Sequence, residues 1–166
     1  MITIDTNMHE VITSISDKLN GIDGQRICMM QATWLVGELR KRIHVEGKAS
    51  DGSQIGAYSS GYMKVRTGDF GNRPTAKKWK NKGQPRPRYN RTNDPKIILS
   101  LTRQMEDGMK VFPLENGAGI GWDNDLDFKK SQWVEETYGK EVYQLTADEL
   151  EGAMNVANVE INRILS

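Results

Sequence analysis

Residues 64–96 constrain the fold most, because this stretch is poor in apolar side chains and is broken by glycine and proline. It carries eleven Lys and Arg residues against Asp69 and Asp94, a net charge of +9. A segment of this composition offers little surface to a hydrophobic core. The core must therefore come from the residues on either side, and residues 64–96 form a long basic arm inserted between them. A loop of this length is usually functional or disordered.

The rest of the chain carries the opposite charge. The sequence has 23 basic and 22 acidic residues, so outside the basic arm 12 basic residues face 20 acidic ones, a net charge of −8. Residues 131–166 alone hold seven acidic side chains against Lys140 and Arg163. Charge separated in this way suits docking to an oppositely charged surface, whether nucleic acid, a partner protein or a second copy of the chain.

Three segments, residues 7–19, 25–45 and 146–165, have the apolar periodicity of amphipathic helices. Thr146 and Glu149 have the spacing of a capping box at the start of the third. We expect Trp34 in the second helix to be buried against the C-terminal helix and the sheet. The apolar stripes are Met8, Val11, Ile12, Ile15 and Leu19 in the first helix, Ile27, Met30, Trp34, Leu35, Leu39 and Ile43 in the second, and Leu150, Ala153, Met154, Ala157, Ile161 and Ile164 in the third.

Shorter elements are predicted in between. Residues 109–112 and 118–122 are expected to pair as a hairpin, because Asn116-Gly117 accepts the positive φ of a tight turn. Further predictions are a loop or irregular hairpin over residues 47–61, a strand or one helical turn over 97–101, a helix over 126–138 and a strand over 141–144. The predicted fold is α+β: one domain over 1–166, with a small, mostly antiparallel sheet packed by two or three helices. The basic arm would lie between the second helix and the sheet.

Residues that would indicate an enzyme are sparse. His9 and His44 have no metal-ligand partner at the expected spacing, and there is no phosphate-binding or dinucleotide-binding motif. The alternating Asp123, Asp125 and Asp127 are interpreted as an acidic turn that opens a helix; a divalent-cation site of a nuclease is the alternative. We expect no catalytic residues, no cofactor and no metal.

The setting of the protein is indicated by two further features. Cys28 is the only cysteine, which is typical of assembly in a reducing cytoplasm. No apolar run reaches the length of a membrane-spanning helix, and the N-terminus lacks the pattern of a secretory signal. We therefore expect no membrane partner.

The basic arm has three interpretations. It crosses the acidic surface of a neighbouring subunit, it grips DNA by phosphate contacts and aromatic stacking, or it is a solvated loop. Head-to-tail packing of arm on acidic surface would build a ring or a filament. The candidate contact residues are Arg73, Lys77, Lys78, Trp79, Lys80, Lys82, Arg86, Arg88, Tyr89 and Arg91. The candidate acidic docking residues are Glu135, Glu136, Glu141, Asp148, Glu149 and Glu151.

Several motifs resemble those of tailed-phage virion morphogenesis (tail completion) proteins. In residues 42–62 a helix ends in a basic residue and is followed by Gly47, Asp51-Gly52 and two tyrosines, as in that family. Residues 99–105 resemble the family's "L…TG.L..S" element, with Arg103 where the family usually has glycine.

Two later stretches extend this resemblance, which covers about residues 26–165. Residues 118–121 match the family's "v.vG" strand, and residues 138–149 match the "fGr.if.Ls..d" lead into a C-terminal helix. The resemblance implies a structural, non-enzymatic virion protein that assembles in the host cytoplasm. It implies a homo-oligomeric ring at the head–tail junction or the top of the tail tube, in contact with neck, connector or tail-tube proteins. Contact with genomic DNA in the lumen of the ring is the alternative for the basic arm.

Overall fold

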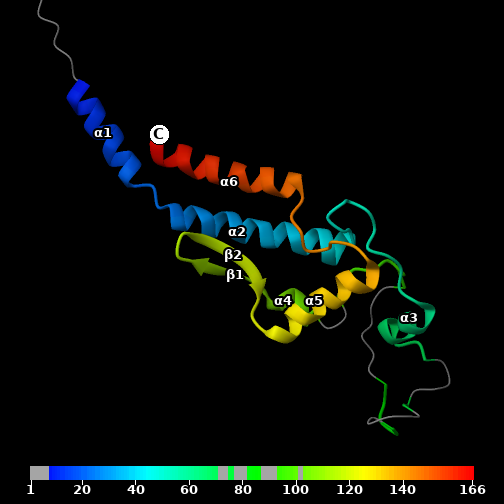
Figure 1. Cartoon of the computed structure of the whole chain (residues 1–166). Helices are drawn as coiled ribbons and strands as arrows, with labels where there is room; N and C mark the ends of the chain where they lie inside the picture. The colour runs from blue at the N-terminus through cyan, green and yellow to red at the C-terminus, as the bar shows by residue number, and fades with distance from the viewer. Residues whose placement is uncertain (1–7, 71–74, 77–81, 87–92, 101–102) are drawn as a thin grey trace, which may run out of the picture. The chain divides into compact units, whose positions relative to one another are not determined.

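The structure is a computed structural model of the chain that describes residues 8–70, 75–76, 82–86, 93–100 and 103–166. These residues form an α+β fold, as predicted, in which helices accompany one two-stranded antiparallel sheet. The helices are α1 (Met8–Asn20), α2 (Gly24–Arg40), α3 (Ser60–Thr67), α4 (Gln104–Gly108), α5 (Asp125–Tyr138) and α6 (Ala147–Leu165); η1 is a π-helical turn, Lys41–Glu46; the strands are β1 (Met109–Leu114) and β2 (Gly117–Trp122) (Figure 1). The three long predicted helices, the hairpin and the helix at 126–138 are confirmed.

The chain divides into two compact units. The first comprises Met1–Glu38, Lys110–Gly121 and Thr146–Ser166, and the second comprises Leu39–Met109 and Trp122–Leu145.

In the first unit, α6 runs beside the N-terminal part of α2 (Figure 1). The indole of Trp34 lies against Gly152 of α6, and Gln31 donates from Nε2 to the carbonyl of Ala153 at 3.0 Å. Gln25 fastens the hairpin to the same helix by donating to the carbonyls of Leu114 and Gly117. The buried apolar side chains of this unit are Ile27, Ala32, Leu35, Val36 and Ala153.

The apolar stripes of α1 and α6 are more exposed than their periodicity predicts. Leu150 and Met154 of the predicted α6 stripe are exposed, and so is Met30 of α2. The buried face of α6 instead includes Glu149, Ala153 and Glu160. Small side chains allow close packing on α2, while the two carboxylates are hydrogen-bonded: Glu149 in the capping box with Thr146, and Glu160 to Arg163.

The second unit has its own apolar core and a buried arginine. The core side chains are Leu39, Ile43, Ala49, Ile55, Ile97, Met109 and Val142. The guanidinium of Arg42 is buried and donates to the carbonyls of Lys48, Val142 and Gln144 at 3.3, 3.0 and 2.9 Å.

Arg42 also explains why the strand predicted at residues 141–144 is wrong. The carbonyls of Val142 and Gln144 accept from Arg42, while the N–H groups of Val142 and Tyr143 donate to Glu135 Oε1 at 2.8 and 3.0 Å. Side chains therefore take the backbone N–H and C=O groups that hydrogen bonding to a second strand would require. Residues 141–144 form no strand and bend at Tyr143 and Gln144.

The long second helix ends in the π-helical turn η1 and stops at Gly47, which has φ 65°. A β-carbon at Gly47 would approach the carbonyl oxygen of Ile97 closely enough to clash, at 2.3 Å. Glycine is required there both by the left-handed backbone and by the close approach of a second chain segment. Residues 47–61 were predicted as a loop or irregular hairpin. They are irregular up to Ser59, with the isolated antiparallel bridges Lys48 to Gln54 and Ala57 to Lys96, and the last two belong to a helix. Residues 97–100 form neither of the two elements predicted for 97–101, and Leu101 lies outside the described residues.

Helix α3 was not predicted, and it shortens the basic arm. Ser59 caps it by accepting from the N–H of Tyr62 at 3.3 Å. Arg66, counted in the arm by sequence, is only 1% exposed. Its guanidinium lies 4.4 Å from the ring centroid of Tyr58 and donates to the carbonyl of Ser100 at 3.1 Å. The helix is difficult to predict from the sequence, because an arginine that packs on a tyrosine ring cannot be distinguished there from a solvent-exposed arginine.

Candidate assembly surfaces

Most of the predicted contact residues of the basic arm lie outside the described residues. These are Arg73, Lys77, Lys78, Trp79, Lys80, Arg88, Tyr89 and Arg91. The described pieces of the arm pair as a short irregular hairpin, in which Thr75 bridges Pro85 and Ala76 donates to the carbonyl of Gln84 at 3.0 Å. Of the two candidate cations described there, Lys82 is exposed in the turn.

Arg86 is the second described candidate, and it has contacts within the chain. Its guanidinium lies 4.8 Å from the ring centroid of Phe70, and Nε donates to the carbonyl of Thr75 at 3.2 Å. This side chain stabilises the arm's own hairpin. Any contact with a partner must therefore compete with the cation–π contact.

The six predicted acidic docking residues are divided between the two units and do not all face solvent. Glu136 and Glu141 in the second unit and Asp148 and Glu151 in the first are exposed. Glu135 is half-buried and accepts two backbone N–H groups. Glu149 is 7% exposed and accepts from the N–H of Thr146 at 2.8 Å, so its inclusion in an exposed acidic surface was wrong. A capping-box carboxylate must turn back to its own helix, which removes it from a docking surface.

The acidic excess lies mainly in the first unit. Outside residues 64–96, the first unit has 4 basic and 10 acidic residues, a net charge of −6, and the second has 8 and 10, a net charge of −2. The basic arm therefore extends from the less acidic unit, whereas most of the acidic excess belongs to the first unit.

A groove with aromatic walls lies in the second unit between the start of α3 and one face of α5, and sequence reasoning missed it. This aromatic groove has a volume of about 580 Å³. Tyr58 and Tyr62 contact each other with ring centroids 4.9 Å apart, and Trp133 on α5 is 56% exposed. Its lining includes Tyr58, Tyr62, Leu99, Trp133, Val134 and Tyr138.

Tyr58, in the wall of the aromatic groove, is held in place by a hydrogen bond and a cation–π contact. Tyr58 accepts from the N–H of Leu99 at 3.1 Å and lies under the guanidinium of Arg66. Leu99 has φ 45°, a left-handed conformation that is rare for a branched residue. Such strain persists only where the surroundings impose it, and it is common at binding sites. The four-residue spacing of Tyr58 and Tyr62 is a sequence signal that could have indicated this wall.

A second surface that sequence reasoning misplaced is the apolar side of α1. Val11, Ile12, Ile15 and Leu19 were expected in the core, but they are between 45% and 58% exposed. We call these four residues the α1 stripe.

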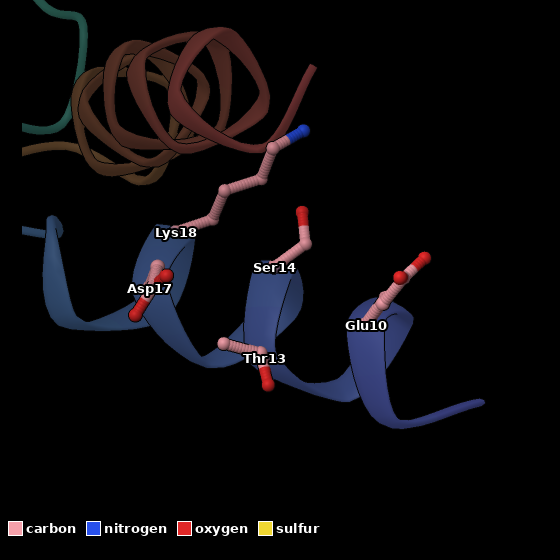
Figure 2. A pocket seen from close by; sticks show the side chains of 5 residues that line it. All are labelled: Glu10, Thr13, Ser14, Asp17 and Lys18. Atoms are coloured by element: carbon pink, nitrogen blue, oxygen red, sulfur yellow. The ribbon is translucent and has the colours of Figure 1, made fainter. Parts of the chain in front are cut away.

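The polar side of α1 is directed toward the end of α6. Figure 2 shows Glu10, Ser14 and Lys18 projecting from one side of the helix. Lys18 reaches the last residues of α6, where Nζ donates to the carbonyls of Leu165 and Ser166 at 2.7 and 3.2 Å. A positive charge at a helix C-terminus is favourable because it meets the negative end of the helix dipole.

The acidic turn at residues 123–127 opens α5, as predicted. Asn124 caps the helix by accepting from the N–H of Asp127 at 2.9 Å, and its Nδ2 donates to Asp123 and Asp127. Lys130 donates to Asp127 at 2.5 Å, and this hydrogen bond is the main reason that the pKa of Asp127 lies below its usual value. Within the described part of the chain, no group of three or more His, Cys, Asp or Glu side chains is placed to hold a metal ion.

His44 is buried in η1 and shares its surroundings with several charges. Its Nδ1 is 3.2 Å from the carbonyl of Ile98, and its Nε2 is buried without a hydrogen-bond partner among the described residues. Burial lowers the pKa of His44, which Glu106 and the Ile98 contact partly offset. Its burial makes it a structural histidine of the second unit.

Among the described residues no helix is both long and apolar enough to cross a membrane. Comparison of the chain with protein-family models, with characterised proteins and with solved structures gives no match.

Proposed function

We propose that this chain is a structural subunit of a tailed-phage virion that forms a ring at the head–tail junction or at the top of the tail tube. Its role there is tail completion or head–tail joining, and its partners are further copies of itself and neighbouring neck, connector or tail-tube proteins. The role is mechanical and not enzymatic, and the subunit assembles in the host cytoplasm.

The observation that carries this proposal is the backbone of Arg103. This residue has φ 63° and precedes the short helix α4. The phage family pattern has glycine at this position, and glycine is the residue that adopts a left-handed backbone at least cost. The backbone at Arg103 thus has the conformation that the glycine of the family pattern favours, although the residue itself departs from the pattern. A second departure is the family's "YA..hq.G" element, which residues 127–132 match only loosely.

The order of elements also supports the proposal. A long helix ends at Gly47, a tyrosine-containing segment follows, the stretch 118–121 lies in a strand, and residues 138–149 lead into a capped C-terminal helix. The opposite charges of the basic arm and of the first unit supply a reason for copies to associate.

The test is the mass of the purified chain in solution at low and high salt, with particles imaged by negative-stain electron microscopy. We expect a closed oligomer whose arm contacts weaken as salt rises, because each exposed ion pair contributes only about 1 kcal/mol or less. Reversal of Lys77, Lys78, Lys80 and Lys82 to glutamate should reduce assembly without unfolding the chain. Absence of any ring, both alone and with phage tail or neck particles added, would refute the proposal.

DNA binding by the basic arm is the second candidate function. It is favoured by the density of charge in residues 64–96 and by the exposed Lys82 in the hairpin turn. Phosphate contacts predict an affinity for duplex DNA that falls steeply with salt, because counterions are released on binding. Absence of binding at low salt would remove this candidate.

A further inference from the structure

We propose that the aromatic groove binds an unpaired base of single-stranded DNA while the basic arm binds phosphates of the same strand. The inference rests on the second candidate function, DNA binding by the basic arm, and adds to it a site for a base. It does not depend on whether copies of the chain form a ring.

The aromatic groove offers accessible rings to a ligand. Trp133 on α5 is 56% exposed and Tyr62 on α3 is 36% exposed, so much of both side chains is free for stacking. Bases of a single strand stack on such side chains whatever their identity, because every base has a π-face. The volume of about 580 Å³ is within the range of roughly 300–1,000 Å³ that is typical of ligand sites.

Contacts within the second unit hold the wall of the groove in place. Tyr58 accepts from the N–H of Leu99 and lies under the guanidinium of Arg66. The carbonyl oxygen of Ile98, the preceding residue, is 3.2 Å from Nδ1 of the buried His44. Because these groups are already fixed, little ordering of side chains opposes the entry of a base.

The charge inside the groove suits an anion. Lys130 is the charged residue among the described residues that line it. Its Nζ pairs with Asp127, but the lysine side chain is 33% exposed and the aspartate side chain only 7%. A ligand in the groove therefore meets the ammonium group and not the carboxylate. Lys129 and Glu136 are exposed elsewhere on α5 and offset each other in charge.

A smaller hollow adjoins the groove at Tyr58 and lies beside the start of the basic arm. It has a volume of about 380 Å³, and its lining includes Tyr58, Lys64 and Asp69. Lys64 follows Tyr62 by two residues on α3, is exposed, and makes no ion pair within the described part of the chain. A base stacked on Tyr62 thus leaves its phosphate within reach of this lysine.

The charge of the second unit selects a polyanion as the partner. The basic arm carries +9 and the remainder of the unit −2, so the unit that holds the groove has a net charge of +7. This charge repels cations and basic peptides, and an acidic peptide has no flat ring at each residue. Single-stranded DNA supplies both phosphates and rings. Duplex DNA keeps its bases paired and stacked, so the groove requires an unpaired base.

Two strands of equal charge test the inference. A fluorescein-labelled oligothymidylate of about 12 nucleotides and an abasic strand of the same length are titrated with the full chain at low salt, and binding is measured by fluorescence anisotropy. Both strands offer the same phosphates, but only the first offers bases. We expect the intact strand to bind roughly tenfold more tightly, because base–aromatic stacking is lost in the abasic strand. Equal affinities overturn the inference.

Substitutions on α5 then locate the base. Trp133→Leu should abolish most of the preference for the intact strand and leave the affinity for the abasic strand unchanged, whereas Trp133→Phe keeps a ring and should retain the preference. Phe128→Leu is the matched control. Phe128 is 49% exposed on the same helix, contacts Trp122 with ring centroids 6.1 Å apart, and is not among the described residues that line the groove. A preference that persists in Trp133→Leu, or that is lost equally in Phe128→Leu, overturns the inference.

The abasic strand separates this inference from the candidate function on which it rests. Reversal of Lys77, Lys78, Lys80 and Lys82 to glutamate should weaken the binding of both strands by the same factor, because both lose the same phosphate contacts. If the unsubstituted chain binds both strands equally, this inference fails and DNA binding by the basic arm stands. If it binds neither strand at low salt, both fail.

Discussion

The indole of Trp34 lies so close to Gly152 that a β-carbon on Gly152 would be 2.0 Å from Cη2 of the ring. This contact joins α2 to α6 within the first unit. The indole can pack this closely only because Gly152 has no side chain, so that the ring contacts the backbone of α6 directly. The ring in turn is half-buried and does not reach the full burial expected from the periodicity of α2.

Gly152→Ala should lower the free energy of unfolding by about 1–3 kcal/mol, the usual cost of an added group in a packed interface. The expected loss opposes the gain of helix propensity that alanine normally brings. Urea denaturation followed by tryptophan fluorescence measures it.

The matched control is Gly37→Ala in α2, where nothing lies within 4 Å of the added β-carbon. This variant should gain up to about 1 kcal/mol, because alanine is the better helix former. Equal effects of the two substitutions would contradict the Trp34 contact.

Periodicity located α2 and α6 because both helices repeat apolar residues every three or four positions. It placed Ile27, Leu35 and Leu39 of α2 correctly in the core. It identified the inner face of α6 only in part, because the close approach at Gly152 depends on the absence of a side chain. An apolar stripe on a helix does not by itself show that the stripe is buried, and α1 is the example. The α1 stripe has the same spacing as a buried one, but it remains exposed.

The candidate surfaces depend on contacts between residues far apart in the sequence. Tyr58, Leu99 and Trp133 come together only after folding, and no local pattern joins them. Arg66 was interpreted as a solvated charge because its partner, a tyrosine ring, is not visible as a charge pattern. Glu149 was assigned both to a capping box and to the acidic docking residues, and the structure confirms the capping box. The basic arm was evident from composition alone, whereas its contacts remain a prediction.

Arg42→Met should destabilise the second unit by about 2–4 kcal/mol. The substitution keeps an unbranched side chain but removes the donors to the carbonyls of Val142 and Gln144, and unsatisfied buried acceptors are costly. Amide hydrogen exchange should accelerate at Val142 and Tyr143, since the segment loses the hydrogen bonds from Arg42 and keeps those to Glu135 and from Ser50. Lys41→Met, an exposed change in the same turn, should stay within about 0.5 kcal/mol. Unchanged exchange in the Arg42 variant would contradict the role assigned to the guanidinium.

His44 should make stability depend on pH below neutrality. Burial is the largest cause that lowers its pKa from the ordinary 6.5, so the unfolded chain takes up a proton at a higher pH than the folded chain does. Stability is therefore at its full value above about pH 6.5 and falls as the pH decreases from there. His44→Asn should reduce the change in urea midpoint between pH 7.5 and 5. His9→Asn, which alters the only other histidine, should retain the change seen in the unsubstituted chain. A pH dependence that is the same in both variants would show that His44 is not its source.

Arg103→Gly should stabilise the chain by about 0.5–1 kcal/mol. The backbone at this position has φ 63°, a conformation that costs a residue with a β-carbon about 1–2 kcal/mol. Glycine removes that cost, but it also makes the unfolded chain more flexible, which offsets part of the stabilisation. Arg103→Ala keeps the β-carbon and should show no such gain, which separates relief of the backbone from loss of the exposed charge. Gln104→Gly, one residue later inside α4, should be destabilising, because glycine there relieves no left-handed backbone. If Arg103→Gly and Gln104→Gly are equally destabilising, the backbone at residue 103 is not left-handed in solution. The agreement with the glycine of the phage family pattern, and with it the main support for the proposed function, would then be lost.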